Sequence, residues 1–128
     1  MSYYISKKVK GNFDKAVKDV KEKLQEEGFG VISEIDIDQK LKEKLNVDFR
    51  PYKILGACNP PAAYEALQKE SKIGTMLPCN VIIQQLTDNS IEIAAVDPVA
   101  SMQSVKNKEL EGIANEIKAK LAKFIEKV

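Results

Sequence analysis

A hairpin late in the chain constrains the fold more than any other feature of the sequence. Residues 81–86 and 91–96 are two runs rich in β-branched residues, and Asp88-Asn89 lies between them as a tight turn. Strands joined by so short a turn pair antiparallel, whereas a doubly wound sheet needs parallel strands joined by crossover helices. The hairpin therefore favours an α+β domain over a doubly wound fold.

The chain begins with a strand pattern followed by a helix pattern. Residues 3–9 alternate apolar and polar side chains, as a half-buried strand does. A helix is predicted next, with Asn12 as its N-cap and Gly28 as the glycine that ends it. The apolar stripe of this helix consists of Phe13, Ala16, Val17, Val20 and Leu24.

The middle of the chain repeats this alternation. Residues 31–37 and 52–57 are rich in apolar and β-branched side chains and are predicted to be strands. Between them we expect a short helix that Asp38 caps and that ends near Asn46. After the second of these strands, Asn59-Pro60 predicts a further helix, because asparagine suits the N-cap and proline suits the first helical position.

A long helix is predicted from Lys106 to the C-terminus. Its apolar residues recur at gaps of four and three, which would suit a coiled coil as well as a helix lying across a sheet. Ile113 and Ile125 widen the stripe, and this favours the helix on a sheet. The recurring residues are Leu110, Ala114, Ile117, Leu121, Phe124 and Val128.

The element order is therefore β-α-β-(α)-β-α-β-β-α, within a single domain spanning residues 1–128. A chain of 128 residues suits one domain with one core. Strands with helices packed on one face and an antiparallel hairpin indicate the α+β class.

The composition excludes several classes of function. Lys and Arg number 20 and Asp and Glu number 19, so a net charge of +1 gives little support for binding nucleic acid. The chain contains no histidine, which removes Ser-His-Asp catalysis, Cys-His catalysis and histidine-ligated metals. No apolar run would span a membrane, and the N-terminus has no apolar signal segment. We expect a cytoplasmic protein whose thiols stay reduced, with no nucleic-acid or membrane partner.

Two short islands hold the only two cysteines of the chain: Cys58-Asn59-Pro60-Pro61 and Leu77-Pro78-Cys79-Asn80. Each cysteine lies beside an asparagine and a proline, where a predicted strand meets a turn or a helix. If Asn59 caps the following helix, the Cys58 thiol lies near a helix N-terminus, where the helix dipole favours a thiolate. The alternative is that each cysteine is a small buried hydrophobe at a strand end.

The chain resembles the domain-of-unknown-function 302 family of small bacterial and archaeal proteins over nearly its whole length. The blocks that carry the resemblance are Gly56-Ala57-Cys58-Asn59-Pro60, Ile73-Gly74-Thr75-Met76-Leu77-Pro78-Cys79 and Val96-Asp97-Pro98. The resemblance implies a TATA-box-binding-protein-like α+β fold, with a curved, mainly antiparallel sheet and helices packed on one face. It implies an architecture and a site but no activity, because a fold does not fix a function.

We expect a binding module whose pocket holds a small ligand or a thiophilic species. The expected wall residues are Cys58, Asn59, Pro60, Pro78, Cys79 and Asp97, although Asp97-Pro98 would also suit a simple turn at the end of the hairpin. Two alternatives stay open. One is a thiol redox protein with Cys58 as nucleophile and Cys79 as resolving thiol. The other is a module without a ligand that forms a homodimer through its C-terminal helix.

Cys58 and Cys79 are also the first candidates for binding a metal. Two thiolates do not complete a tetrahedral zinc site, whereas copper(I) accepts two soft sulfur ligands. Twenty residues separate the two cysteines, so no Cys-x-x-Cys motif is present. The residues name no cofactor, and whether the chain is an enzyme stays open.

Overall fold

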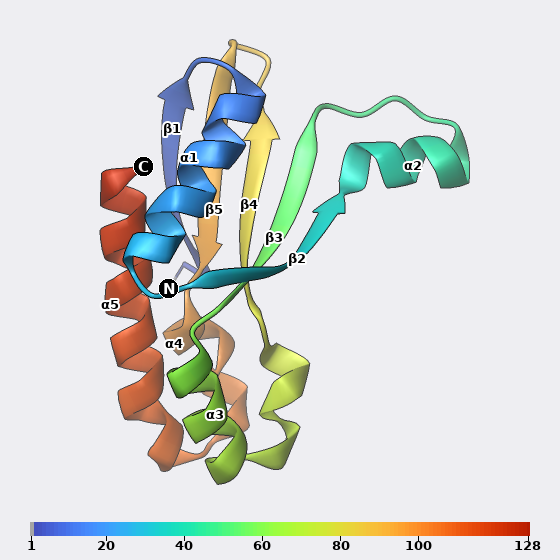
Figure 1. Ribbon diagram of the computed structural model, residues 1–128. Coiled ribbons are helices and arrows are strands. Elements are labelled where there is room, and N and C mark those ends of the chain that lie inside the picture. Colours follow the sequence, from blue (N-terminus) through green and yellow to red (C-terminus); the bar gives the residue numbers. More distant parts are fainter. Residues whose placement is uncertain (1) are drawn as a thin grey trace.

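The computed structural model describes residues 2–128 and contains a five-stranded sheet (Figure 1). Its strands are β1 (Tyr4–Lys10), β2 (Gly30–Asp36), β3 (Tyr52–Cys58), β4 (Cys79–Gln85) and β5 (Ser90–Val96). They lie in the order β1-β5-β4-β3-β2, and every neighbouring pair is antiparallel. The sheet does not close, so β1 and β2 are its two edge strands.

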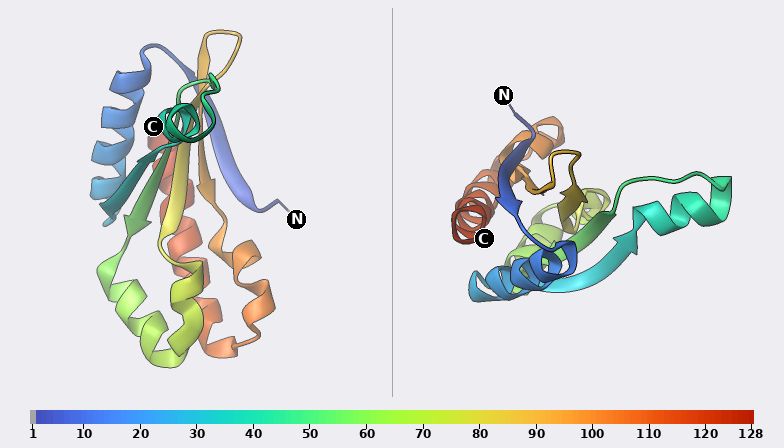
Figure 2. Two further views of the ribbon diagram at one scale, coloured as in Figure 1. Left: turned by 90° about the vertical axis from the view of Figure 1, so that its right-hand side faces the viewer. Right: turned by 90° about the horizontal axis from the view of Figure 1, so that it is seen from above.

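The helices take three positions around this sheet (Figures 1 and 2). Helices α1 (Phe13–Glu26) and α5 (Glu111–Lys127) cover one face, and α2 (Ile37–Leu45) projects away from the body. Helices α3 (Pro60–Lys69) and α4 (Pro98–Ser101) gather at one end of the strands, as Figure 1 shows. Three short 3-10 helices complete the chain: η1 (Ser71–Met76), η2 (Gln103–Val105) and η3 (Lys108–Leu110). The predicted α+β class, an antiparallel sheet with helices on one face, is confirmed.

Local signals in the sequence explain the first helix and the hairpin. The backbone N–H of Lys15 donates to Asn12 Oδ1 at 2.9 Å, so Asn12 is the N-cap of α1. Gly28 follows the end of α1 at a φ of 87°, a left-handed conformation that favours glycine. In the hairpin, Ile83 lies opposite Ile93, and both are fully buried beneath the helices. The period-two pattern of the sequence therefore becomes one apolar face of the sheet.

The core lies between this face and helices α1 and α5. Val20 and Leu24 of α1 are fully buried, as are Leu121 and Phe124 of α5. Ile113 and Ile125 are buried as well, so the apolar stripe of α5 is wider than a coiled-coil seam. The interpretation of α5 as a helix lying across the sheet is confirmed, and its apolar stripe is occupied within the chain.

Two of the predicted helix starts are wrong. The last α-helix begins at Glu111 and not at Lys106, because Lys106 adopts a left-handed conformation with a φ of 55° and interrupts the helix. Asp38 is not an N-cap. The N-cap of α2 is Asp36, and the carboxylate of Asp38 accepts instead from the backbone N–H of Tyr52 at 3.2 Å. Within residues 2–128, no helix combines the length and the apolar character needed to cross a bilayer.

Candidate functional site

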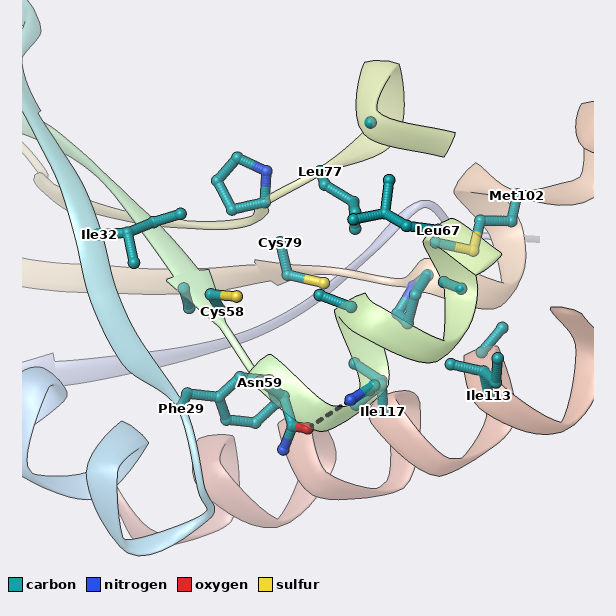
Figure 3. Close-up of a pocket in the computed structure, with 18 residues that line it drawn as sticks. Phe29, Ile32, Cys58, Asn59, Leu67, Leu77, Cys79, Met102, Ile113 and Ile117 are labelled. Carbon is teal, nitrogen blue, oxygen red and sulfur yellow. Dashed lines mark hydrogen bonds between the residues drawn. The ribbon is translucent and has the colours of Figure 1, made fainter. Parts of the chain in front are cut away.

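An apolar cavity of about 340 Å³ lies at the end of the sheet where α3 is packed (Figure 3). Ala57, Cys58 and Cys79 wall it from the ends of β3 and β4. The cavity floor comes from the covering helix α5, through Ile113 and Ile117. Two islands that lie far apart in the sequence therefore meet around one space.

Helix α3 starts at this cavity because Asn59 fixes both its N-terminus and its position. Asn59 Oδ1 accepts from the backbone N–H of Ala62 at 3.1 Å, and Asn59 Nδ2 donates to the carbonyl of Gly28 at 3.3 Å. Pro60 occupies the first helical position, as predicted. The amide of Asn59 thus ties α3 to the turn after α1, and both of its polar atoms have partners within the fold.

Small side chains on α3 leave the cavity open. Ala62, Ala63 and Ala66 line it from this helix, at the spacing that places residues on one helical face. Leucine or isoleucine at these positions would extend into the space between α3 and the strand ends. The small side chains on one face of this helix are the signal in the sequence that could have predicted the cavity.

The two cysteines are free thiols with different exposures. Cys79 is 8% exposed and lies opposite Ala57 in the β3–β4 register, whereas Cys58 is half-buried at the end of β3. Figure 3 shows both side chains directed into the cavity. Burial, together with the neighbouring Cys58, raises the pKa of the Cys79 thiol to about 11. Cys79 is therefore protonated at neutral pH, and a protonated thiol is a poor nucleophile.

Gly56 is needed because the chain is crowded where β3 enters the cavity wall. A Cβ atom at Gly56 would lie 2.7 Å from Cγ of Pro78, and it would also collide with Oγ of Ser33. The proline ring has no rotamer that moves it aside, so only glycine fits between β2 and the turn before β4. The pairing of β3 with β4, in which Ala57 lies opposite Cys79, places the two cysteine islands side by side at this crowded point.

Asp97 lies outside the cavity lining, and so does Pro60. The carboxylate of Asp97 accepts from the backbone N–H groups of Val99 at 2.9 Å and Ala100 at 3.2 Å, and it forms an ion pair with Lys118 at 2.9 Å. Burial alone would raise the pKa of Asp97, but these hydrogen bonds outweigh it and lower the pKa below its usual value. Asp97 thus caps α4 and ties it to α5, while its neighbour Pro98 reaches the cavity.

The apolar wall residues from β2, α3 and the α4 region were not identified from the sequence. They include Phe29, Ile32, Leu67 and Met102. The register of β2 against β3 shifts between Val31 and Ser33, which makes Ile32 the extra residue of a β-bulge. Ile32 is 65% exposed and Leu67 is 45% exposed, so these two residues mark the rim where the cavity meets solvent.

Charge is absent from this lining. Among residues 2–128, the only polar side chain in the wall is that of Asn59, whose amide is already engaged. No group of three or more His, Cys, Asp or Glu side chains within the same residues is placed to hold a metal ion. A copper(I) ion between Cys58 and Cys79 would require both thiols to lose their protons in an apolar space.

Comparison with known proteins gives a family and a fold but no activity. The model of a family described as domain of unknown function DUF302 matches residues 5–128. The crystal structure of an uncharacterized conserved DUF302 protein from Bacillus stearothermophilus is similar to this one, with a TM-score of 0.91 and 27% sequence identity. The similarity covers 99% of this chain and 98% of that chain. No curated protein matches the chain.

Proposed function

The chain belongs to the DUF302 family, and we propose that it binds a small molecule whose apolar part enters the cavity beside Cys58 and Cys79. The uncharged lining carries this proposal. A charged or strongly polar group placed in the cavity would lose its hydration and find no partner, because the amide of Asn59 is occupied and Cys79 is protonated. An apolar group would lose no such interaction.

The size of the cavity sets the size of the ligand. Cavities of about 150 Å³ with apolar walls stay dry and hold benzene, so a cavity of about 340 Å³ would hold roughly twice as many atoms. A bicyclic aromatic ring or a chain of roughly twelve carbons meets this estimate. The volume also lies within the usual range of small-molecule sites, about 300–1,000 Å³.

Sulfur atoms give the wall a preference among apolar ligands. Cys58, Cys79 and Met102 all line the cavity, and Phe29 lines it as well. Thioether sulfur is polarisable and makes favourable contacts with aromatic rings. We therefore expect an aromatic or unsaturated group to bind more tightly than a branched aliphatic group of equal volume.

Fluorescence titration with 2-naphthol tests the proposal, because this probe has a bicyclic apolar body, carries one small hydroxyl group and is uncharged at pH 7. We expect saturable binding of one molecule per chain. Ala63→Leu would occupy part of the cavity from α3 and weaken the binding at least tenfold. Ala122→Leu is the matched control, because Ala122 is a half-buried alanine on α5 that does not line the cavity. This control variant should bind 2-naphthol as the native chain does.

Iodoacetamide labelling provides a second readout that is independent of fluorescence. Bound 2-naphthol should slow the alkylation of Cys58, which is half-buried in the wall, while Cys79 should react only after denaturation. If the native chain binds no uncharged apolar probe, or if a folded Ala63→Leu variant binds as well as the native chain, the proposal is wrong. Fast labelling of Cys58 at pH 6 in the native chain would instead favour the thiol redox alternative, in which Cys58 is the nucleophile.

A further inference from the structure

A second cavity, of about 310 Å³, lies next to the first one. It is formed by the segment from α4 to η3 and by the first turns of α5. Its chemistry differs from that of the first cavity, because Lys106, Glu111 and Asn115 contribute to its lining. The two cavities share two residues, Met102 and Ala114.

Only two side chains among residues 2–128 line both cavities. Ala114 contributes a single methyl group from α5, so Met102 is the larger of the two shared side chains. Methionine is unbranched and has three rotatable bonds, so it changes rotamer at lower cost than the branched residues of the core. A rotation of the Met102 side chain would join the apolar space to the polar one.

The polar cavity offers both a donor and acceptors. Within residues 2–128, no hydrogen bond or ion pair engages the side chain of Lys106 or that of Glu111. Asn115 Nδ2 donates to the carbonyl of Glu111 at 2.9 Å, and no donor among residues 2–128 bonds to Asn115 Oδ1. One cation and one anion sum to no net charge. They suit a head group that is neutral overall and both donates and accepts hydrogen bonds.

We infer that the two cavities form one site for an extended amphipathic molecule, with its apolar body beside the cysteines and a neutral hydroxyl-type or amide-type head beside Lys106 and Glu111. The inference rests on the proposed function, since it identifies the class of molecule whose apolar part fills the first cavity. The side chain of Met102 is the gate between the two halves of the site.

Competition between 2-naphthol and 1-alkanols of 8 to 16 carbons tests this inference. Each added CH₂ should raise the affinity about fourfold. The rise should continue beyond roughly twelve carbons, the length that fills the first cavity alone. Alkanoates and alkylammonium ions of equal length should bind more weakly than the alkanols. If the rise stops at the length of the first cavity, or if either ion binds more tightly than the alkanol, the inference is wrong.

A matched pair of variants locates the second half of the site. Asn115→Trp would fill the polar cavity from α5 without touching the first cavity, and Glu116→Trp places the same side chain at an exposed neighbour that lines neither. Asn115→Trp should lower hexadecanol affinity at least tenfold and leave 2-naphthol affinity unchanged, while Glu116→Trp should change neither. Unchanged hexadecanol binding by Asn115→Trp would overturn the inference and leave the proposed function standing. Failure of 2-naphthol to bind the native chain would overturn both.

Discussion

Two helices with similar sequence patterns differ in how much of their apolar side is buried. Both α2 and α5 carry apolar residues at helical spacing, yet α5 buries six of its residues and α2 buries none. Helix α5 lies against the sheet, whereas α2 is part of an arm, residues 37–51, that projects from the end of β2 (Figures 1 and 2). Helical periodicity thus predicts that a helix forms, but the surface available to it decides whether its apolar side is buried.

Polar contacts connect the arm to the sheet and link α2 to the segment that follows it. Arg50 Nε donates to Gln84 Oε1 at 2.8 Å, and the guanidinium lies 4.4 Å from the centre of the Phe49 ring. Lys42 and Asp48 form an ion pair at 3.1 Å, with both side chains largely exposed. Exposed pairs of this kind contribute about 0–1 kcal/mol. The arm therefore rests on contacts that are individually weak, while the body rests on its core.

The largest expected effect lies in the core beneath α5. Phe124 is fully buried, so Phe124→Ala should lower the free energy of unfolding by about 3–5 kcal/mol. Lys123→Ala, at the exposed neighbouring position, should change it by less than about 0.5 kcal/mol. Urea denaturation measures both values. A loss below about 1 kcal/mol for Phe124→Ala would mean that α5 does not anchor the body.

The next largest effect is expected at Gly56, where β3 enters the cavity wall. Gly56→Ala forces a Cβ atom against Pro78 and should cost about 1–3 kcal/mol in the free energy of unfolding. Gly112→Ala is the control, because nothing lies within 4 Å of a Cβ there and alanine favours the helix. That variant should gain up to about 1 kcal/mol. Equal stabilities for the two variants would contradict the close packing at Gly56.

A smaller effect, which depends on pH, is expected at Asp97. Asp97→Ala removes the N-cap of α4 and the ion pair with Lys118, and it should cost about 1–2 kcal/mol at pH 7. Because the pKa of Asp97 is lowered in the folded state, its contribution is complete above the unfolded value of about 4 and is lost as the pH falls through the folded value. Denaturation of both chains at pH 7 and pH 2.5 should show their difference shrinking in acid. A difference that persists in acid would assign the effect to packing.

The smallest effect is expected in the arm. Leu45 is 66% exposed, so Leu45→Ala should change the free energy of unfolding by less than about 0.5 kcal/mol. Hydrogen exchange should show the amides of α2 exchanging much faster than those of the central strand β4, because local opening of α2 exposes no buried residue. Strong protection of α2, or a cost above about 1 kcal/mol for Leu45→Ala, would show that a second surface covers the arm in solution.

The sequence predicted the parts of the fold that depend on local chemistry. Asn12 and Asn59 cap the helices assigned to them, and the hairpin forms as its β-branched runs and tight turn indicated. The start of α5 was missed, because the left-handed conformation of Lys106 is set by the path of the chain and carries no composition signal. The strand bounds differ from the predicted ones by one or two residues.

The candidate site was only partly predictable. Proline and asparagine beside each cysteine marked Cys58, Asn59, Pro78 and Cys79, and the structure brings these four residues to one cavity. Asp97 was grouped with them, but it caps α4 and contacts Lys118. The apolar walls could not be identified, because a residue that lines an open cavity and one that fills a core have the same chemistry. Only the three-dimensional packing of α3 against α5 distinguishes them.

The order of the strands has a consequence for whether copies of this chain aggregate at high concentration. An open sheet exposes unpaired N–H and C=O groups at each edge strand, and such strands are templates for aggregation. Here one of them, β1, carries Lys7, Lys8 and Lys10, and the other, β2, is interrupted by the bulge at Ile32. Lysines and bulges on edge strands both disfavour the addition of a strand from another molecule. The sheet therefore keeps two exposed edge strands that are both poor templates for fibril formation.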